Sequence, residues 1–327
     1  SAVRILFKPE TEKSERDVAY SGFMEGLSKK YPDNHEVAAF YALSLLGSVP
    51  DGRDDELYGK GAKIALGILA ENPEHPGALH YTIHSYDDPR HAALALEAAN
   101  AYSKVAPDAS HALHMPSHIY VAMGMWGRVV DSNIDSYQAS LNRMERKELG
   151  NDDRGYHAFH WLEYGYLQQD NREEARKMVW DMQRYMNETP SPRARVHMVF
   201  LKGTYLTETD EWESDIADIP VEISDLNISV RSQYNFLEGM KGYTAKDTVE
   251  MDRIIAVMQA DIDRETYVQE FSSASLCSNV TRAEAAPSDI VTSKARQQQL
   301  IALREDLAGR HDAAEEHLQK SIELQES

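Results

Sequence analysis

The sequence predicts an all-α protein built from antiparallel pairs of helices. Amphipathic segments of about 10–16 residues recur along the chain and are separated by Pro, Gly or Asn turns. No stretch has the alternating apolar and polar residues of a strand. Three histidine-bearing segments, residues 75–86, 110–120 and 156–166, can also be superposed. A self-match at a fixed spacing indicates a repeat array, so the helices are expected to stack as similar units.

Turn signals set the helix boundaries in chain order. Pro76 stands in a first helical turn, where a missing N–H is tolerated, and Pro89 ends that helix. Pro107 and Gly124 mark later turns. The expected helices span residues 15–31, 35–46, 56–71, 76–86, 90–105, 110–123, 127–143, 156–169, 172–187, 193–206, 230–243, 248–263, 293–308 and 312–324, with a short helix after Trp212. Residues 218–229 and 271–287 are expected to be irregular, and the charged segment 143–155 is expected to be a mobile loop.

Pro116 falls inside the helix that is expected to begin near Ser110. A proline there removes one backbone hydrogen bond and kinks the helix axis. One interpretation is that the helix begins late and leaves His114 in a preceding loop. The other is that the kink turns His114 against His118.

Helix pairs at a spacing of 34 residues resemble the tetratricopeptide repeat (TPR). That family has small residues and aromatics where the two helices meet, an alanine early in the second helix and a proline at the end of the unit. The matching residues are Ala95, Ala99 and Pro107, then Tyr120, Gly124 and Trp126, then Tyr166 and Ala175. The resemblance implies a TPR-like right-handed α-solenoid that forms a single domain over residues 1–327. Its clearest repeats cover residues 30–190, and degenerate repeats with a C-terminal helical hairpin cover residues 191–327.

The phrases HPGALHYTIH and HMPSHIY are also similar to a bacterial subfamily of TPR proteins. TPR proteins place ligand-contacting residues on a concave face, at about the second, fifth and ninth positions of each first helix. The resemblance therefore implies a concave wall lined mostly with imidazole. The residues at these positions are Gly77, His80 and His84, then His111, His114 and His118, then His157, His160 and Tyr164.

Nine of the thirteen histidines lie between His75 and His160. His80 and His84 are four residues apart, as are His114 and His118, so each pair projects from one helical face and can chelate an ion. Neutral imidazole suits Zn, Cu or Fe. We expect one transition-metal ion to be bound by these residues, which are His80, His84, His114 and His118, with His157 or His160 completing the shell.

Other residues near this face are weaker candidates. His111 and Tyr164 are possible additional ligands through their repeat positions. Glu163 and Asp87 lie near the site and are candidates for carboxylates that support the ligands or act as a general base. Helical spacing places Glu163 beside His160, and the alternative is an ordinary exposed glutamate. His75 is expected to hold the turn before its helix, and His91 is expected at the surface.

Composition limits the classes of partner and compartment. The net charge of −20, from 54 acidic and 34 basic residues, argues against nucleic-acid binding. No apolar run approaches the ~20 residues that a membrane span needs. The one cysteine, Cys277, excludes an internal disulfide and a thiolate-rich metal site. The chain starts without a methionine or a signal segment, so we expect a processed N-terminus and a soluble protein of the bacterial cytoplasm or periplasm.

The histidine face is compatible with three functions. The histidine face could hold the metal centre of an enzyme that acts on a small molecule. It could be the groove of a TPR interaction module that binds a peptide. It could also be the site of a metal carrier without catalysis. TPR peptide grooves usually present Lys, Arg and Asn, whereas this one presents His and Tyr, which favours a metal. The sequence does not choose between catalysis and carriage.

Overall fold

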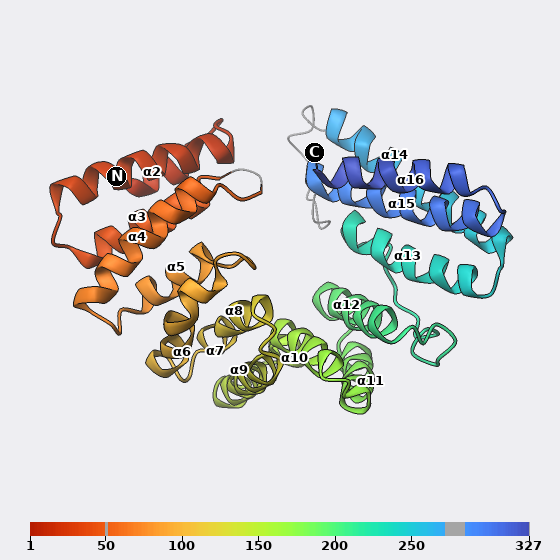
Figure 1. Ribbon diagram of the computed structural model, residues 1–327, viewed down its shortest axis with the longest axis horizontal. Helices are drawn as coiled ribbons and strands as arrows, with labels where there is room; N and C mark the ends of the chain where they lie inside the picture. Colours follow the sequence, from red (N-terminus) through yellow and green to blue (C-terminus); the bar gives the residue numbers. More distant parts are fainter. Residues whose placement is uncertain (50–51, 272–284, 327) are drawn as a thin grey trace. The chain divides into compact units, whose positions relative to one another are not determined.

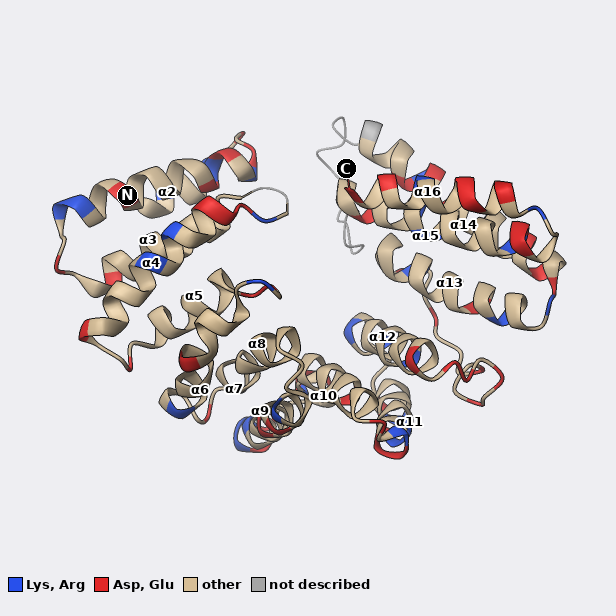
Figure 2. Cartoon of the chain, viewed as in Figure 1, with Lys and Arg blue, Asp and Glu red and all other residues tan. Residues whose placement is uncertain are grey.

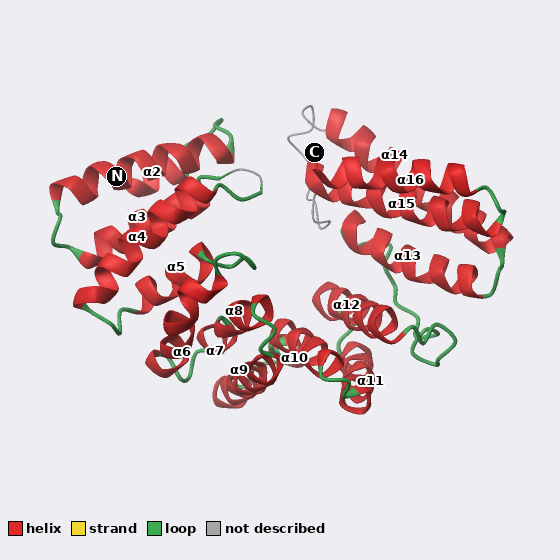
Figure 3. Ribbon diagram, viewed as in Figure 1, coloured by secondary structure: helices red, strands yellow, loops and turns green. Residues whose placement is uncertain are grey.

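The computed structural model of the chain consists of helices joined by loops (Figures 1 and 3) and describes residues 1–49, 52–271 and 285–326. No residue in these ranges lies in a strand, so the predicted all-α class is confirmed. The chain folds as two compact units, Ser1–Gln169 and Asp170–Ser327. The single domain over residues 1–327 that the TPR resemblance implies stays a prediction.

The first unit is a stack of helices in which each one packs on the next. Its elements are α1 (Ala2–Leu6), α2 (Lys13–Lys30), α3 (His35–Gly47), α4 (Asp55–Glu71), α5 (Pro76–Ser85), the 3-10 helix η1 (Ala92–Ala95), α6 (Leu96–Val105), α7 (Ser110–His114), α8 (Pro116–Ala122), α9 (Trp126–Lys147), the 3-10 helix η2 (Asn151–Asp153) and α10 (Tyr156–Gln168). Consecutive helices pack together throughout, and α3 also packs on α5, and α5 on α8. This is the arrangement of a TPR-like α-solenoid of antiparallel helix pairs.

His75 holds the turn before α5, as the sequence predicts. Its Nδ1 accepts a hydrogen bond from the backbone N–H of Ala78 at 3.1 Å, which satisfies a donor that has no partner inside the helix. Pro76 occupies the first helical turn. His75 is therefore a capping residue and lies outside the histidine face.

Pro116 divides the helix expected over residues 110–123 into α7 and α8. Before the proline, the Met115 N–H bonds the carbonyl of His111, four residues back. After it, the His118 N–H bonds the carbonyl of Met115, three residues back, so the helix tightens where the proline cannot donate. His114 lies in α7 and not in a loop, so the late-start interpretation is wrong. The helix is interrupted at Met115, directly before the proline.

Two other expectations for the first unit need correction. The helix expected over residues 90–105 begins as η1 and becomes an α-helix only at Leu96. The charged segment 143–155 is partly helical, because α9 continues to Lys147 and η2 follows. The Gly155 N–H then donates to Ser140 Oγ at 2.9 Å, which ties the end of the segment to α9.

The second unit continues the same pattern of packed consecutive helices. Its elements are α11 (Arg172–Glu188), α12 (Pro192–Thr209), α13 (Ile228–Thr244), α14 (Thr248–Phe271), α15 (Pro287–Leu307) and α16 (His311–Glu326). The irregular stretch expected over residues 218–229 is confirmed up to the start of α13, but the short helix expected after Trp212 does not form. Most of the loop expected over residues 271–287 lies outside the described residues.

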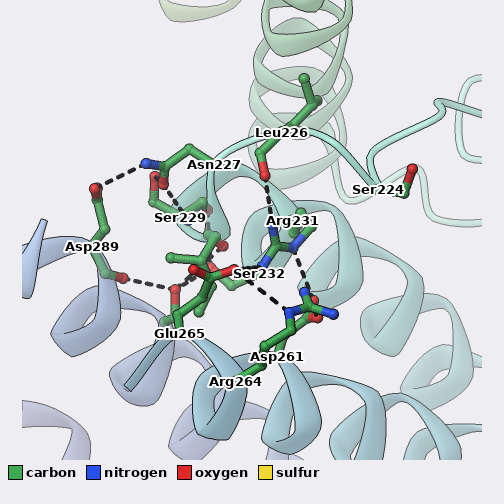
Figure 4. A network of polar contacts seen from close by, with 12 residues as sticks. Ser224, Leu226, Asn227, Ser229, Arg231, Ser232, Asp261, Arg264, Glu265 and Asp289 are labelled. Atoms are coloured by element: carbon green, nitrogen blue, oxygen red, sulfur yellow. Dashed lines mark hydrogen bonds and ion pairs between the residues drawn. The ribbon is translucent and has the colours of Figure 1, made fainter. Parts of the chain in front are cut away.

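Buried basic side chains hold the irregular segment 210–227 against the helices. Lys202 donates to the carbonyl of Ile219 at 3.0 Å, and Arg195 donates to the carbonyl of Glu222 at 2.7 Å. Arg231 donates to the carbonyl of Leu226 and pairs with Asp261 and Glu265 (Figure 4). These donors satisfy carbonyl groups that lack helical partners. The cations of this region are thus structural.

No helix among the described residues is long and apolar enough to cross a membrane.

Candidate metal centre

The first helices of the repeats in the first unit are almost free of charge. Helices α5, α7 and α8 contain no Lys, Arg, Asp or Glu, and α10 contains only Glu163 (Figure 2). The apolar residues of α5, α7 and α8, including Leu79, Ile83 and Ile119, join one hydrophobic cluster with α6 and α9. The histidines project from helices that are fixed by this packing.

Six histidines form two groups of three. His80 and His84 of α5 and His111 of α7 form the His80 triad, in which the three candidate ligand atoms all lie within 4.8 Å of one another. The His114 triad meets the same limit and consists of His114 of α7, His118 of α8 and His157 of α10. Each triad therefore joins two successive repeats. The expected single centre placed His80, His84, His114 and His118 around one ion, whereas the structure divides these four between two triads.

The imidazole of His114 is 3% exposed, and its proton position is fixed by Asn133. Asn133 Nδ2 donates to the carbonyl of Val129 at 2.8 Å, which leaves its Oδ1 facing the ring at 2.7 Å from His114 Nδ1. An amide oxygen can only accept, so His114 carries its proton on Nδ1. Burial lowers the pKa of His114 to about 3, which favours the neutral ring. Its Nε2 then presents a lone pair.

His118 is oriented by a carboxylate in the same way. Asp87 Oδ2 lies 2.8 Å from His118 Nδ1, and a carboxylate accepts, so Nδ1 is the donor. A carboxylate on the remote ring nitrogen is the usual support of a metal-bound histidine. The Nε2 atoms of His118 and His114 face each other at 3.2 Å.

Trp161 forms a wall of the His114 triad. Its ring centroid lies 4.9 Å from that of His114, 4.6 Å from that of His118 and 5.8 Å from that of His157. The indole limits the positions that the three imidazoles can adopt. His157 is on the exposed side, so the triad opens to solvent there.

The His80 triad has a similar inner contact. His80 Nε2 lies 3.1 Å from His111 Nε2, and the His80 ring stacks on Tyr102 with centroids 5.3 Å apart. Burial, followed by the neighbouring imidazoles, lowers the pKa of His80 to about 3. Burial also lowers the pKa values of His84 and His111. All three rings therefore favour the neutral form that can bind a metal.

The remaining predicted site residues lie outside the triads. His160 belongs to neither triad. Tyr164 packs edge-on against Trp126, with ring centroids 5.7 Å apart. Glu163 is 0% exposed, so the expectation of an exposed side chain is wrong. Neither of its carboxyl oxygens has a hydrogen-bond partner, and burial raises its pKa well above the ordinary value. His91 is half-buried beside Asp88 and also lies outside the triads.

Two residues around the His114 triad, Asn133 and Trp161, were not predicted from the sequence to belong to the site. Asn133 is the more informative, since it is a fully buried amide in the long amphipathic helix α9. The signal was available, because a polar residue on an apolar helix face requires a buried partner. Trp161 carried no such signal, because aromatic residues are common in repeat cores.

Comparison with known proteins gives no family. No family model matches the sequence, and no curated protein matches it. Among solved structures, the chain is similar to a human IFIT1 dimer with m7Gppp-AAAA, at 12% identity and a TM-score of 0.38 over 96% of this chain and 79% of that one. A human IFIT1 dimer with PPP-AAAA gives 12% identity and a TM-score of 0.37 over 96% and 80% of the two chains.

Proposed function

We propose that the chain binds a transition-metal ion at the His114 triad. The ligands would be Nε2 of His114, Nε2 of His118 and a ring nitrogen of His157. The observation that carries the proposal is the 3.2 Å separation of two Nε2 atoms whose protons are both on the far side of their rings. Two facing lone pairs repel each other, and a cation between them turns the repulsion into coordination.

The separation also fits the geometry of a metal site. Zinc–imidazole bonds of about 2.0–2.1 Å in a tetrahedron place two ligand nitrogens about 3.3 Å apart. A ligand set of three neutral imidazoles suits Zn, Cu or Fe, whereas Mg²⁺ and Ca²⁺ prefer oxygen. A proton on His118 Nε2 would also relieve the contact, since Asp87 can pair with an imidazolium. The metal titration below distinguishes these two explanations.

The ligand number favours an enzyme over a carrier. Structural zinc sites usually have four protein ligands, whereas catalytic sites have three and leave a position for water or substrate. The His114 triad offers three ligands and opens to solvent at His157. A metal bound there would lower the pKa of a bound water molecule. The bacterial TPR subfamily remains our proposal for the chain's origin, and its net charge of −20 supports the proposal that nucleic acid is not a partner.

Metal titration of the metal-free chain tests this proposal. We expect Zn²⁺ to bind in isothermal titration calorimetry at neutral pH, and Co²⁺ to give the visible absorption of nitrogen-coordinated, low-symmetry cobalt. His114→Ala and His118→Ala should each weaken this binding, while His91→Ala should not. If the wild-type chain binds neither ion, or if both triad variants bind as the wild type does, the protonated pair explains the contact and the face is a groove for a polar peptide.

A further inference from the structure

The His80 triad reproduces the His114 triad one repeat earlier in the chain. A shift of 34 residues carries His80 onto His114 and His84 onto His118, and the repeat positions match His111 with His157. The ring spacings match as well. The centroids of His80 and His84 are 4.7 Å apart, against 5.1 Å for His114 and His118. Those of His80 and His111 are 4.9 Å apart, against 4.6 Å for His114 and His157.

We infer that the His80 triad is a second, weaker metal site, so that the chain binds two transition-metal ions, one in each triad. This inference rests on the proposed function of the His114 triad. Three imidazoles occupy the same repeat positions in both triads, with similar ring spacings. A neutral imidazole set that holds an ion in one repeat can therefore hold one in the repeat before it.

Within the part of the chain that the structure describes, the His80 triad has no counterpart of the Asn133 and Asp87 hydrogen bonds, and this makes it the weaker site. Asn133 and Asp87 orient His114 and His118. One repeat earlier, the register positions of these two residues are Ala99 and Arg53. An alanine cannot accept a hydrogen bond, and an arginine can only donate one.

The structure agrees with this difference in the surroundings of His84. Among the described residues, no side chain or backbone group makes a hydrogen bond to the His84 ring, whereas His118 has Asp87. An unsupported ring must be ordered when the metal binds, and this ordering lowers the affinity. Loss of such supporting contacts typically weakens metal binding about 10–100-fold.

The two sites should also influence each other. The rings of His84 and His118 lie edge to face with centroids 6.2 Å apart, so the triads are neighbours. Asp87 contacts His118 and is close enough that its charge acts on His84. Two divalent ions in adjacent triads repel each other, and one carboxylate offsets this only in part. The ions should bind in two separate steps, with the His114 triad filled first.

Counting Zn²⁺ ions on the intact chain tests the inference. Native mass spectrometry and calorimetry should find two ions on the wild-type chain, bound in two steps that differ at least about tenfold in affinity. His84→Ala should remove the weak step and keep the tight one. His118→Ala should remove the tight step, and His91→Ala should change neither. Circular dichroism of each variant verifies that it is folded.

The possible outcomes separate this inference from the proposal on which it rests. One ion on the wild-type chain, with His84→Ala unchanged, would overturn the second site and leave the His114 triad in place. One ion that is lost in both His84→Ala and His118→Ala would instead indicate a single shared centre, and this also overturns the inference. Absence of any bound ion would overturn both proposals.

Discussion

The buried imidazole of His114 donates a hydrogen bond from Nδ1 to the side-chain oxygen of Asn133 at 2.7 Å. Asn133 is itself held by its bond to the carbonyl of Val129. The pair joins α7 to the second helix of its repeat and sets which ring nitrogen of His114 faces the triad. The side-chain amide of Asn133, which is part of the repeat core, thereby determines which nitrogen of His114 is free to bind a metal.

Asn133→Ala should weaken the tight Zn²⁺ step about 10–100-fold without changing the number of ions bound. The variant leaves the Nδ1–H of a buried imidazole without a partner, so the ring is no longer held with Nε2 toward the metal. Calorimetry with Zn²⁺ measures the affinity. Asn142→Ala, an exposed residue of the same helix, is the matched control. Equal affinity in Asn133→Ala and the wild type would contradict the role of Asn133.

Asp87→Asn should also weaken the tight step, by roughly tenfold. An asparagine oxygen can still accept from His118 Nδ1, but it lacks the negative charge that makes the ring a stronger donor to a metal. Co²⁺ absorption should show weaker binding with the same coordination. Asp108→Asn changes the charge equally at an exposed position and should leave both steps unaltered. If Asp87→Asn instead bound the ion more tightly than the wild type, Asp87 would be shown to stabilise a protonated His118.

Zn²⁺ should raise the melting temperature of the chain, and a chelator should reverse the effect. An ion that binds only the folded state adds about 2.7 kcal/mol when its free concentration is 100 times Kd. Differential scanning calorimetry of metal-free protein with and without Zn²⁺ measures the shift. Mg²⁺ should produce none, because the site offers nitrogen ligands. A His114→Ala/His118→Ala double variant should lose most of the shift, and an unchanged shift there would place the ion elsewhere.

Glu163 should make the metal-free chain less stable as the pH rises above about 4.5. Burial raises its pKa in the folded state, so above the ordinary value of 4.5 the folded chain holds a proton that the unfolded chain has released. The contribution of Glu163 to the free energy of unfolding is therefore greatest below pH 4.5. Between pH 4.5 and the raised pKa it decreases by up to about 1.4 kcal/mol per pH unit.

Glu163→Gln removes this titration while keeping the shape of the side chain. As the pH rises, the free energy of unfolding of the variant should therefore increase relative to that of the wild type. Urea denaturation at several pH values measures the difference. Glu173→Gln, at an exposed position on the next helix, should show no such trend. A pH-independent difference for Glu163→Gln would mean that the carboxyl group is not held in its neutral form.

The sequence predicted the positions of the helices better than the grouping of the histidines into two triads. Turn residues such as Pro76 and Gly124 act locally, so most helix ends were placed within a few residues. The grouping of ligands depends on how successive repeats meet. His111 was only a possible addition in the sequence, yet its position at the start of α7 brings it against His80 of the preceding repeat. Helical spacing within one segment cannot show a contact made between segments.

The burial of Glu163 could not be predicted from the spacing of nearby residues. Glu163 lies three residues after His160, and that spacing suggested a carboxylate beside the ligands. The structure instead encloses it completely and gives its oxygens no hydrogen-bond partner. The interruption of the helix at Pro116 was predictable because the missing N–H is a property of the residue itself.

Each triad takes ligands from two successive repeats, and this has a mechanical consequence. An α-solenoid bends and stretches by small openings at the interfaces between its repeats. A coordination bond that crosses such an interface resists the separation of the two repeats. An ion in the His114 triad would link α7 and α8 to α10, and one in the His80 triad would link α5 to α7. The stiffness of the first unit would then depend on metal binding. The metal-free chain would deform easily, and the metal-bound chain would resist deformation.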